Sequence, residues 1–248
     1  MIEILTGDNK DVIPTLVSRP YQLIYLDPPR EETYDAIFRC GIGDLTYLRA
    51  VTPRLDPDRG VLVIFTNIKN RSAYERYIAD TFSYLRLYQE IIWHYDFGTY
   101  TRARFVPSHD NILIYTVGEP LFNWESIAIT SQRQEAEDKR ADQRGRVPGT
   151  VWSIPRVPGN SRSRRILGES VGLGRSQHPV PLVERIVKAY TKPGDYVLDP
   201  FAGTGTTLWV CKYIGRNCTG IEINPAFAKQ IQDRLSQEQE TMSLREDL

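Results

Sequence analysis

Short apolar runs alternate with stretches of helical spacing along this chain of 248 residues. Several of these apolar runs end at an acid, which is followed by Pro in two cases, as is typical of strands that lead into turns. Strands are expected at residues 2–5, 21–26, 60–65, 87–94, 111–117, 196–198 and 220–222, and helices at 10–17, 45–55, 71–82, 181–190, 206–215 and from Pro225 onward. This alternation favours an α/β fold with a mostly parallel sheet and helices on both faces.

Composition places the chain among ordinary soluble globular proteins, with 41% hydrophobic and 25% charged residues and zero formal net charge. Any nucleic-acid surface must therefore come from local clustering of cations. Cys40, Cys211 and Cys218 show no paired spacing, so no metal site is expected and the cytoplasm is the expected location. We find no signal sequence and no apolar stretch long enough to span a bilayer.

Four acidic residues stand where predicted strands end: Asp8, Asp27, Asp199 and Glu222. Acids after strands are often simple turn formers. In a mostly parallel sheet, however, several such acids meet at one carboxyl edge, where open α/β sheets bind their ligands. The pattern predicts a ligand site at this edge.

The stretch from Asp199 to Thr207 joins a strand to a helix through Gly203 and Gly205. Glycine allows close approach of a ligand to the backbone, and the helix start offers free N–H groups. Glu222 ends the next strand at the spacing of an acid that holds a ribose. A glycine turn alone indicates only a nucleotide-like ligand.

Asp27-Pro28-Pro29 forms a second candidate site. The consecutive prolines fix the backbone and leave a carbonyl without a neighbouring N–H donor. One carboxylate and one carbonyl oxygen could then accept both hydrogens of an exocyclic amine and direct its lone pair toward an electrophile. The alternative is a plain strand terminator.

Leu26–Pro29 followed much later by Asp199–Thr207 resembles the permuted, beta-class-like family of S-adenosylmethionine-dependent DNA amino-methyltransferases. Other stretches are similar to that family as well: 7–9, 91–93, 104–105, 109–115, 151–155 and 177–179. The resemblance implies a Rossmann-like methyltransferase with a twisted sheet of seven strands. It further implies a single catalytic domain over 1–248, in which 119–177 carries inserted loops for target recognition and DNA contact.

The resemblance also implies a role for individual residues. Asp27, Pro28, Pro29 and Arg30 would form the catalytic site, and S-adenosylmethionine would be held by Asp8, His178, Asp199, Pro200, Phe201, Gly203, Gly205, Thr206 and Glu222. Within that set, Asp8 would accept from the adenine of the cofactor, Glu222 would bind its ribose, and His178 would close its methionine end. The target base would be flipped out of the duplex.

Arg30 departs from the family pattern, which usually has an aromatic residue there to stack on the flipped base. A guanidinium plane can stack on a base, and so can Tyr34 from the following loop. A third interpretation is an impaired base pocket.

Two polar segments lie in the second half of the chain. Residues 132–146 mix both charges and are interpreted as a solvated loop. Residues 156–175 carry five arginines and one acid, which suits a loop that wraps phosphates, although a merely flexible basic loop fits as well. The DNA-contact candidates are Arg102, Arg104, Arg156, Arg162, Arg164, Arg165 and Arg175.

The first functional hypothesis is a site-specific DNA adenine-N6 methyltransferase. Asp at position 27 favours adenine, because members of the family that act on cytosine N4 more often have serine there. The alternatives are a cytosine-N4 enzyme and, because of Arg30, a non-catalytic subunit that binds cofactor or DNA. DNA is the expected partner, and the resemblance allows a homodimer and a cognate restriction endonuclease.

Overall fold

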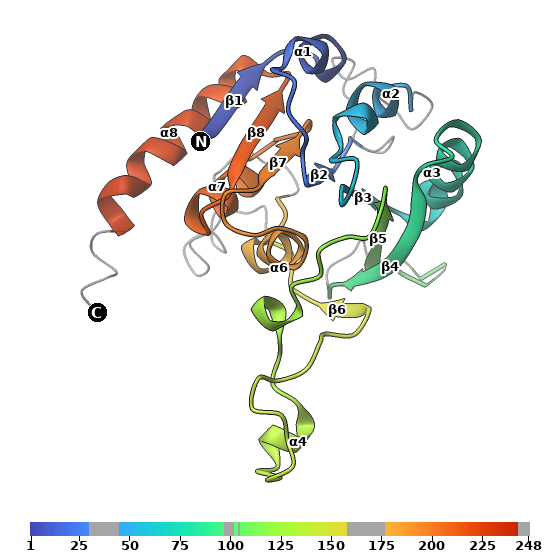
Figure 1. Ribbon diagram of the computed structural model, residues 1–248, viewed down its shortest axis with the longest axis vertical. Helices are drawn as coiled ribbons and strands as arrows, with labels where there is room; N and C mark the ends of the chain where they lie inside the picture. Colours follow the sequence, from blue (N-terminus) through green and yellow to red (C-terminus); the bar gives the residue numbers. More distant parts are fainter. Residues whose placement is uncertain (30–44, 97–101, 104, 158–176, 243–248) are drawn as a thin grey trace.

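In a computed structural model, the protein is described over residues 1–29, 45–96, 102–103, 105–157 and 177–242, with backbone alone for 237–242 (Figure 1). The strands are β1 (Ile2–Thr6), β2 (Leu23–Leu26), β3 (Val61–Thr66), β4 (Arg86–His94), β5 (His109–Thr116), β6 (Val151–Ser153), β7 (Tyr196–Asp199) and β8 (Asn217–Glu222). The helices are α1 (Asn9–Thr15), α2 (Tyr47–Val51), α3 (Ile68–Thr81), α4 (Gln132–Glu135), α6 (Val180–Tyr190), α7 (Thr206–Tyr213) and α8 (Pro225–Met242), and the 3₁₀ turns are η2 (Thr52–Arg54) and η3 (Trp124–Ile127).

All the strands join one sheet in the order β1-β8-β7-β2-β3-β5-β4-β6. Every neighbouring pair is parallel except the two pairs that β5 makes with β3 and β4. The expected α/β fold with a mostly parallel sheet is confirmed. The expected number of strands is wrong, because the described part of the sheet has eight. The extra strand, β6, has only three residues, too few for a recognisable apolar run, and it forms through its pairing with β4.

The sheet separates two apolar layers, because successive residues of a strand point to opposite faces. Leu23 and Tyr25 of β2 pack with α6 and α7 in one core cluster. Ile24 and Leu26 pack with α1, α2 and α3 in the other. The central strands are therefore apolar at nearly every position, as sheets covered on both faces require.

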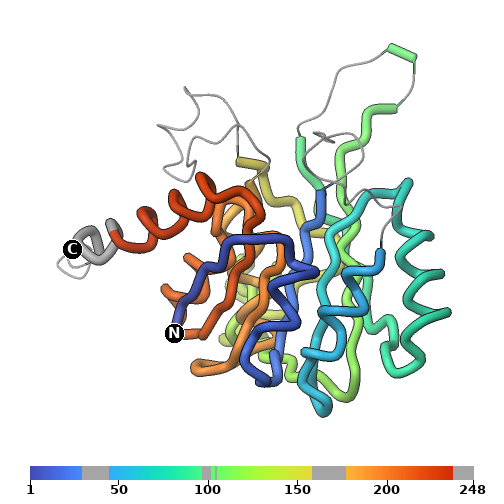
Figure 2. The backbone as a smooth tube through the Cα atoms, turned by 90° about the horizontal axis from the view of Figure 1, so that it is seen from above, coloured from blue at the N-terminus to red at the C-terminus, as the bar shows by residue number. Residues whose placement is uncertain are grey.

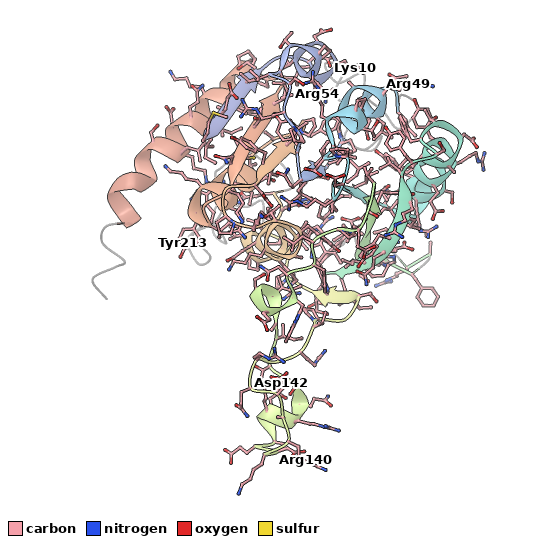
Figure 3. The ribbon with its side chains drawn as sticks, in the orientation of Figure 1. Lys10, Arg49, Arg54, Arg140, Asp142 and Tyr213 are labelled. Atoms are coloured by element: carbon pink, nitrogen blue, oxygen red, sulfur yellow. The ribbon has the colours of Figure 1, made fainter. Side chains whose placement is uncertain are left out.

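Most expected helices are present with slightly shifted ends, but the expected helix over 45–55 is interrupted. Its regular part ends at Val51, and Pro53 lies in the 3₁₀ turn η2 that follows. Proline has no N–H for the helical ladder. Arg54 then reaches α1, where its Nη2 donates to the Ile13 carbonyl at 2.8 Å (Figure 3). No helix in the described part of the chain is long and apolar enough to cross a membrane.

Residues 124–150 form an arm that stands away from the sheet, with α4 near its tip (Figure 1). An antiparallel bridge between Ile129 and Arg146 closes its stem. Ser131 and Gln134 form a reciprocal capping box on α4, and the exposed Arg140 pairs with Asp138 at 2.9 Å (Figure 3). Most of 132–146 is exposed, as expected for a solvated loop, and local capping and backbone pairing also give this segment a defined fold.

Candidate functional site

The acidic residues singled out in the sequence follow four neighbouring strands. Strands β1, β8, β7 and β2 lie side by side and run in the same direction, so Asp8, Glu222, Asp199 and Asp27 gather at one carboxyl edge. Figure 2 shows this sheet from another side, with its strands running alongside one another. The arrangement brings the glycine loop after β7 next to the Asp27 turn after β2.

The glycine loop depends on two left-handed backbone positions. Gly203 has φ +54° and Gly205 has φ +74°, where residues with a Cβ are strained. A Cβ on Gly203 would meet only the Phe201 carbonyl oxygen, at 3.7 Å, so the space beside it is open. At Gly205 a Cβ would lie 2.8 Å from Cγ2 of Ile231. Gly205 is therefore required for packing, whereas Gly203 leaves backbone accessible to a ligand.

Glu222 fastens this loop to the sheet. Its Oε2 accepts a hydrogen bond from the Gly203 N–H, and its Oε1 accepts from the Asn224 N–H, both at 2.9 Å. The Gly7 N–H donates to the Glu222 backbone carbonyl at 3.1 Å. Glu222 therefore ties the glycine loop after β7 to the turns that follow β8 and β1.

Asp199 is buried at the centre of the same edge, with 3% of its surface exposed. Burial raises the pKa of this carboxyl to about 7, and the charges of Asp27 and Glu222 add to the rise. Hydrogen bonds from Thr207 and from the Phe201 N–H oppose that shift of the pKa. A cationic ligand at this edge would favour the ionised form of Asp199.

Asp8 and Asn9 close the far side of the edge. Asp8 caps α1 by accepting from the Lys10 N–H at 2.9 Å. The Asn9 amide donates to the Pro200 carbonyl at 3.2 Å and so links the β1 turn to the glycine loop. Oδ1 of Asn9 is buried and has no hydrogen-bond partner among the residues that the structure describes. Asn9 was noted in the sequence only as part of the Gly7–Asn9 turn, and its link to Pro200 was not predicted.

Two other residues of the expected cofactor set have structural contacts. Phe201 packs edge-on against Tyr47, with the ring centroids 5.1 Å apart. Thr206, the first residue of α7, is buried, and its hydroxyl lies 3.2 Å from that of Thr204. These contacts stabilise the conformation of the glycine loop that follows β7.

Asp27 directly follows β2, and its side chain is 28% exposed. Its Oδ2 lies 3.2 Å from Nε2 of His178, which stands two residues before α6, and the neighbouring Pro28 is buried. Nδ1 of His178 in turn lies 2.7 Å from the Tyr25 hydroxyl. His178 was expected at the methionine end of a cofactor, and the structure places it against the Asp27 carboxylate.

Three aromatic side chains surround His178. The Phe65 ring centroid is 4.2 Å from that of His178, Trp93 is at 5.3 Å and Tyr25 at 5.9 Å. The sequence analysis did not predict these aromatic contacts or the contact of the Tyr25 hydroxyl with His178. The sequence shows only that Tyr25 and Asp27 are two positions apart at the end of a strand.

Of the arginines expected to contact DNA, the structure describes Arg102 and Arg156. Arg156 donates to Asp110 at 3.0 Å and to the Tyr95 hydroxyl at 3.1 Å, and it lies over the Tyr95 ring. Arg102 is exposed. Arg30, Tyr34, Arg104, Arg162, Arg164, Arg165 and Arg175 lie outside the described residues. Within the described segments, no group of three His, Cys, Asp or Glu side chains is arranged to hold a metal ion.

Comparison with known proteins shows which family the chain resembles. The sequence model of a DNA methylase family, N6_N4_Mtase, matches residues 21–233. The chain is 28% identical to the DNA adenine methyltransferase YhdJ of Escherichia coli over 91% of its own length and 80% of that protein. It is 27% identical to the type II methyltransferase M1.MboII of Moraxella bovis, over 93% of this chain and 91% of the relative. Against M.HpaI of Haemophilus parainfluenzae, at 31% identity, the match spans 60% of this chain and 45% of the relative.

Solved structures have the same fold. The M1.HpyAVI–SAM complex superposes with a TM-score of 0.67 at 20% identity, over 94% of this chain and 100% of the other. The cytosine-N4-specific PvuII DNA methyltransferase superposes with a TM-score of 0.65 at 16% identity, over 92% of this chain and 84% of the other. At these identities the likeness concerns the fold.

Proposed function

This chain belongs to the DNA methylase family, and on that premise we propose that it transfers the methyl group of S-adenosylmethionine to the exocyclic N6 amine of adenine at a specific DNA sequence. The observation that carries the proposal is the adjacency of two turns. The amine-holding Asp27-Pro28-Pro29 follows β2, and the glycine loop follows its parallel neighbour β7.

The glycine-loop side fits S-adenosylmethionine. Gly203 has open space beside its Cα among the described residues, Glu222 is an acid at the spacing suited to ribose hydroxyls, and Asp199 is an acid that a cation would ionise. Asp8, Asn9, Pro200, Phe201, Gly205 and Thr206 complete the proposed pocket. When bound, S-adenosylmethionine supplies an electrophilic methyl group. The M1.HpyAVI structure, which contains SAM in the same fold, supports this assignment.

Asp27 is the proposed acceptor for the target amine. Its carboxylate and the Pro28 carbonyl would each accept one N–H, which directs the nitrogen lone pair out of the base plane toward the methyl donor. The methylated nitrogen is cationic and loses a proton readily, so no strong general base is needed. The partial exposure of Asp27 leaves it accessible to a base that has been flipped from the duplex.

Adenine is the proposed base for two reasons. Position 27 is an aspartate, and YhdJ, of which the match spans 80%, is an adenine methyltransferase. The cytosine-N4-specific PvuII enzyme has the same fold, so cytosine is the competing outcome of the test. Arg30 or Tyr34 is the proposed stacking partner of the flipped base.

DNA contact is assigned to the 119–177 region and to the arginines named above. For Arg156 this role requires the guanidinium to contact DNA while it keeps its hydrogen bonds to Asp110 and to the Tyr95 hydroxyl. We further propose a cytoplasmic protein that works as one catalytic domain, with a second copy of itself and a cognate restriction endonuclease as its candidate partners.

The test is product analysis after incubation of DNA with purified protein and cofactor labelled in the methyl group. Label in N6-methyladenine is expected, and its absence from reactions of an Asp27→Ala variant serves as the control. Label in N4-methylcytosine would overturn the choice of base. If neither product forms without a second protein, the non-catalytic subunit is the better description.

A further inference from the structure

A chain of three polar groups links the buried core to the candidate amine acceptor. The Tyr25 hydroxyl, the His178 imidazole and the Asp27 carboxylate follow one another at 2.7 Å and 3.2 Å. Tyr25 lies on β2, and Asp27 directly follows that strand. His178, two residues before α6, contacts both side chains.

Elementary chemistry sets the direction of this chain. A carboxylate can only accept, so the proton between His178 and Asp27 belongs on Nε2 of the imidazole. In the neutral ring Nδ1 then has a lone pair and needs a donor. Burial raises the pKa of Tyr25 well above its usual range, which keeps its hydroxyl protonated and able to donate. The tautomer of His178 is thus fixed from the Tyr25 side.

The surroundings of His178 prevent other arrangements of the ring. The side chain is 6% exposed and is held between Phe65 and Trp93. Trp93 is itself fixed by donation from its Nε1 to the Ile154 carbonyl at 2.7 Å. The imidazole can therefore neither turn to water nor flip freely.

We propose that His178 is a positioning residue that holds Asp27 Oδ2, so that Oδ1 stays turned toward the target amine, and that Tyr25 sets the tautomer of His178. This role rests on the proposed function of Asp27 as the amine acceptor. A carboxylate after a strand can otherwise rotate about its last torsion, and among the described residues Oδ2 alone of the two oxygens has a partner. Fixing one oxygen leaves the other in a single orientation.

The kinetic test compares three variants with wild type. Tyr25→Phe keeps the ring but removes the donor, and His178→Gln keeps an amide that can donate to Asp27 without the imidazole tautomer. Tyr21→Phe is the matched control, because Tyr21 is also buried on the chain segment leading into β2 and its hydroxyl lies 3.3 Å from that of Thr219, outside this chain of groups. We expect Tyr25→Phe to lower kcat on the order of tenfold while the dissociation constant of S-adenosylmethionine stays unchanged.

The double variant Tyr25→Phe/His178→Gln tests whether the two residues act in series. We expect it to be no slower than His178→Gln alone, because Tyr25 acts through the imidazole. Additive losses would overturn the proposal, as would equal losses in Tyr25→Phe and Tyr21→Phe. If His178→Gln weakens cofactor binding and leaves kcat unchanged, His178 contacts the cofactor and does not position Asp27.

A spectroscopic readout separates this inference from the proposed function. Long-range ¹H–¹⁵N correlation of the imidazole rings at neutral pH, with His178 assigned by its loss in His178→Gln, reports which ring nitrogen carries the proton. Protonated Nε2 with unprotonated Nδ1 in wild type, altered in Tyr25→Phe but not in Tyr21→Phe, is expected whether or not the protein methylates DNA. The opposite tautomer in the wild-type protein would contradict the proposed Tyr25–His178–Asp27 arrangement, even if the protein methylates DNA. The expected tautomer in a protein that does not methylate DNA would overturn the proposed function alone.

Discussion

The two sides of the candidate site are held in different ways. On the cofactor side, backbone groups do most of the work: the Gly203 and Asn224 N–H groups bind Glu222, and the Phe201 N–H binds Asp199. On the amine side, the Asp27 carboxylate lies against another side chain, His178, which a further side chain, Tyr25, contacts. The cofactor side is a property of the loop conformation, whereas the amine side is a property of a few side chains.

This difference has a consequence for substitutions. Changes of side chain should separate the two sides cleanly, because few side chains belong to both. Asp199 and Asp27 connect the two sides, since the charge of Asp27 adds to the rise in the pKa of Asp199. Any coupling between the sides should therefore be electrostatic and should follow pH.

The largest effect is expected for Asp27→Ala. Removing the carboxylate deletes an acceptor for the target amine and should lower kcat on the order of 10³-fold, as for other single groups that stabilise a transition state. Single-turnover transfer of labelled methyl at saturating cofactor measures this. A loss of less than tenfold would show that the Asp27 side chain does not hold the reacting group.

Asp199→Asn should change stability in a pH-dependent way. Because the folded pKa of about 7 lies above the ordinary value of 3.8, the folded protein binds the proton more tightly than the unfolded chain between those pH values. Wild-type stability contributed by Asp199 therefore falls as pH rises through this range and is lowest above pH 7. Relative to wild type, the variant should gain on the order of 4 kcal/mol in unfolding free energy between pH 4 and pH 8.

Urea unfolding of both proteins at several pH values checks this prediction. The test is how the difference in unfolding free energy between the two proteins changes with pH. Its value at a single pH is not informative, since the amide also alters the hydrogen bonds to Thr207 and Phe201. A difference that stays constant from pH 4 to pH 8 would contradict a buried carboxyl with a raised pKa.

Neutralising Arg162, Arg164 and Arg165 should weaken DNA binding and reduce its salt dependence. Each lost phosphate contact lowers the slope of log affinity against log salt by about 0.9. The matched control neutralises three cations that lie outside 119–177, Arg86, Lys188 and Lys192, of which Arg86 and Lys188 are already paired with acids. Fluorescence anisotropy across a salt series should show the change in the first triple variant, with cofactor affinity intact; equal slopes in the two would refute the DNA role of 162–165.

The smallest effects are expected for two glycines that share a left-handed backbone. Gly203 and Gly215 have φ of +54° and +72°, and a Cβ on either meets no close contact within the protein. Alanine at either position should cost about 1 kcal/mol of stability in urea unfolding. Only Gly203→Ala should also weaken cofactor binding, and equal cofactor affinity in the two variants would show that the loop is not approached by the ligand.

The fold could be predicted largely from the sequence, because apolar runs such as 60–65 are buried on both faces and cannot be anything but central strands. The edge strand β6 could not, since three residues pair only because β4 is already there. The glycine loop was visible as a motif because the backbone itself requires glycine. The contact of His178 with Asp27 was not, because 151 residues separate them and only the packing of α6 on the sheet brings them together.

The division between the two sides is tested most directly by one measurement, the dissociation constant of S-adenosylmethionine for Asp27→Ala and Gly203→Ala determined by titration calorimetry. The account predicts near wild-type affinity for Asp27→Ala and about tenfold weaker binding, roughly 1.4 kcal/mol, for Gly203→Ala. If Asp27→Ala loses cofactor affinity as severely as Gly203→Ala, then Asp27 belongs to the cofactor pocket and the proposed division of the site is wrong.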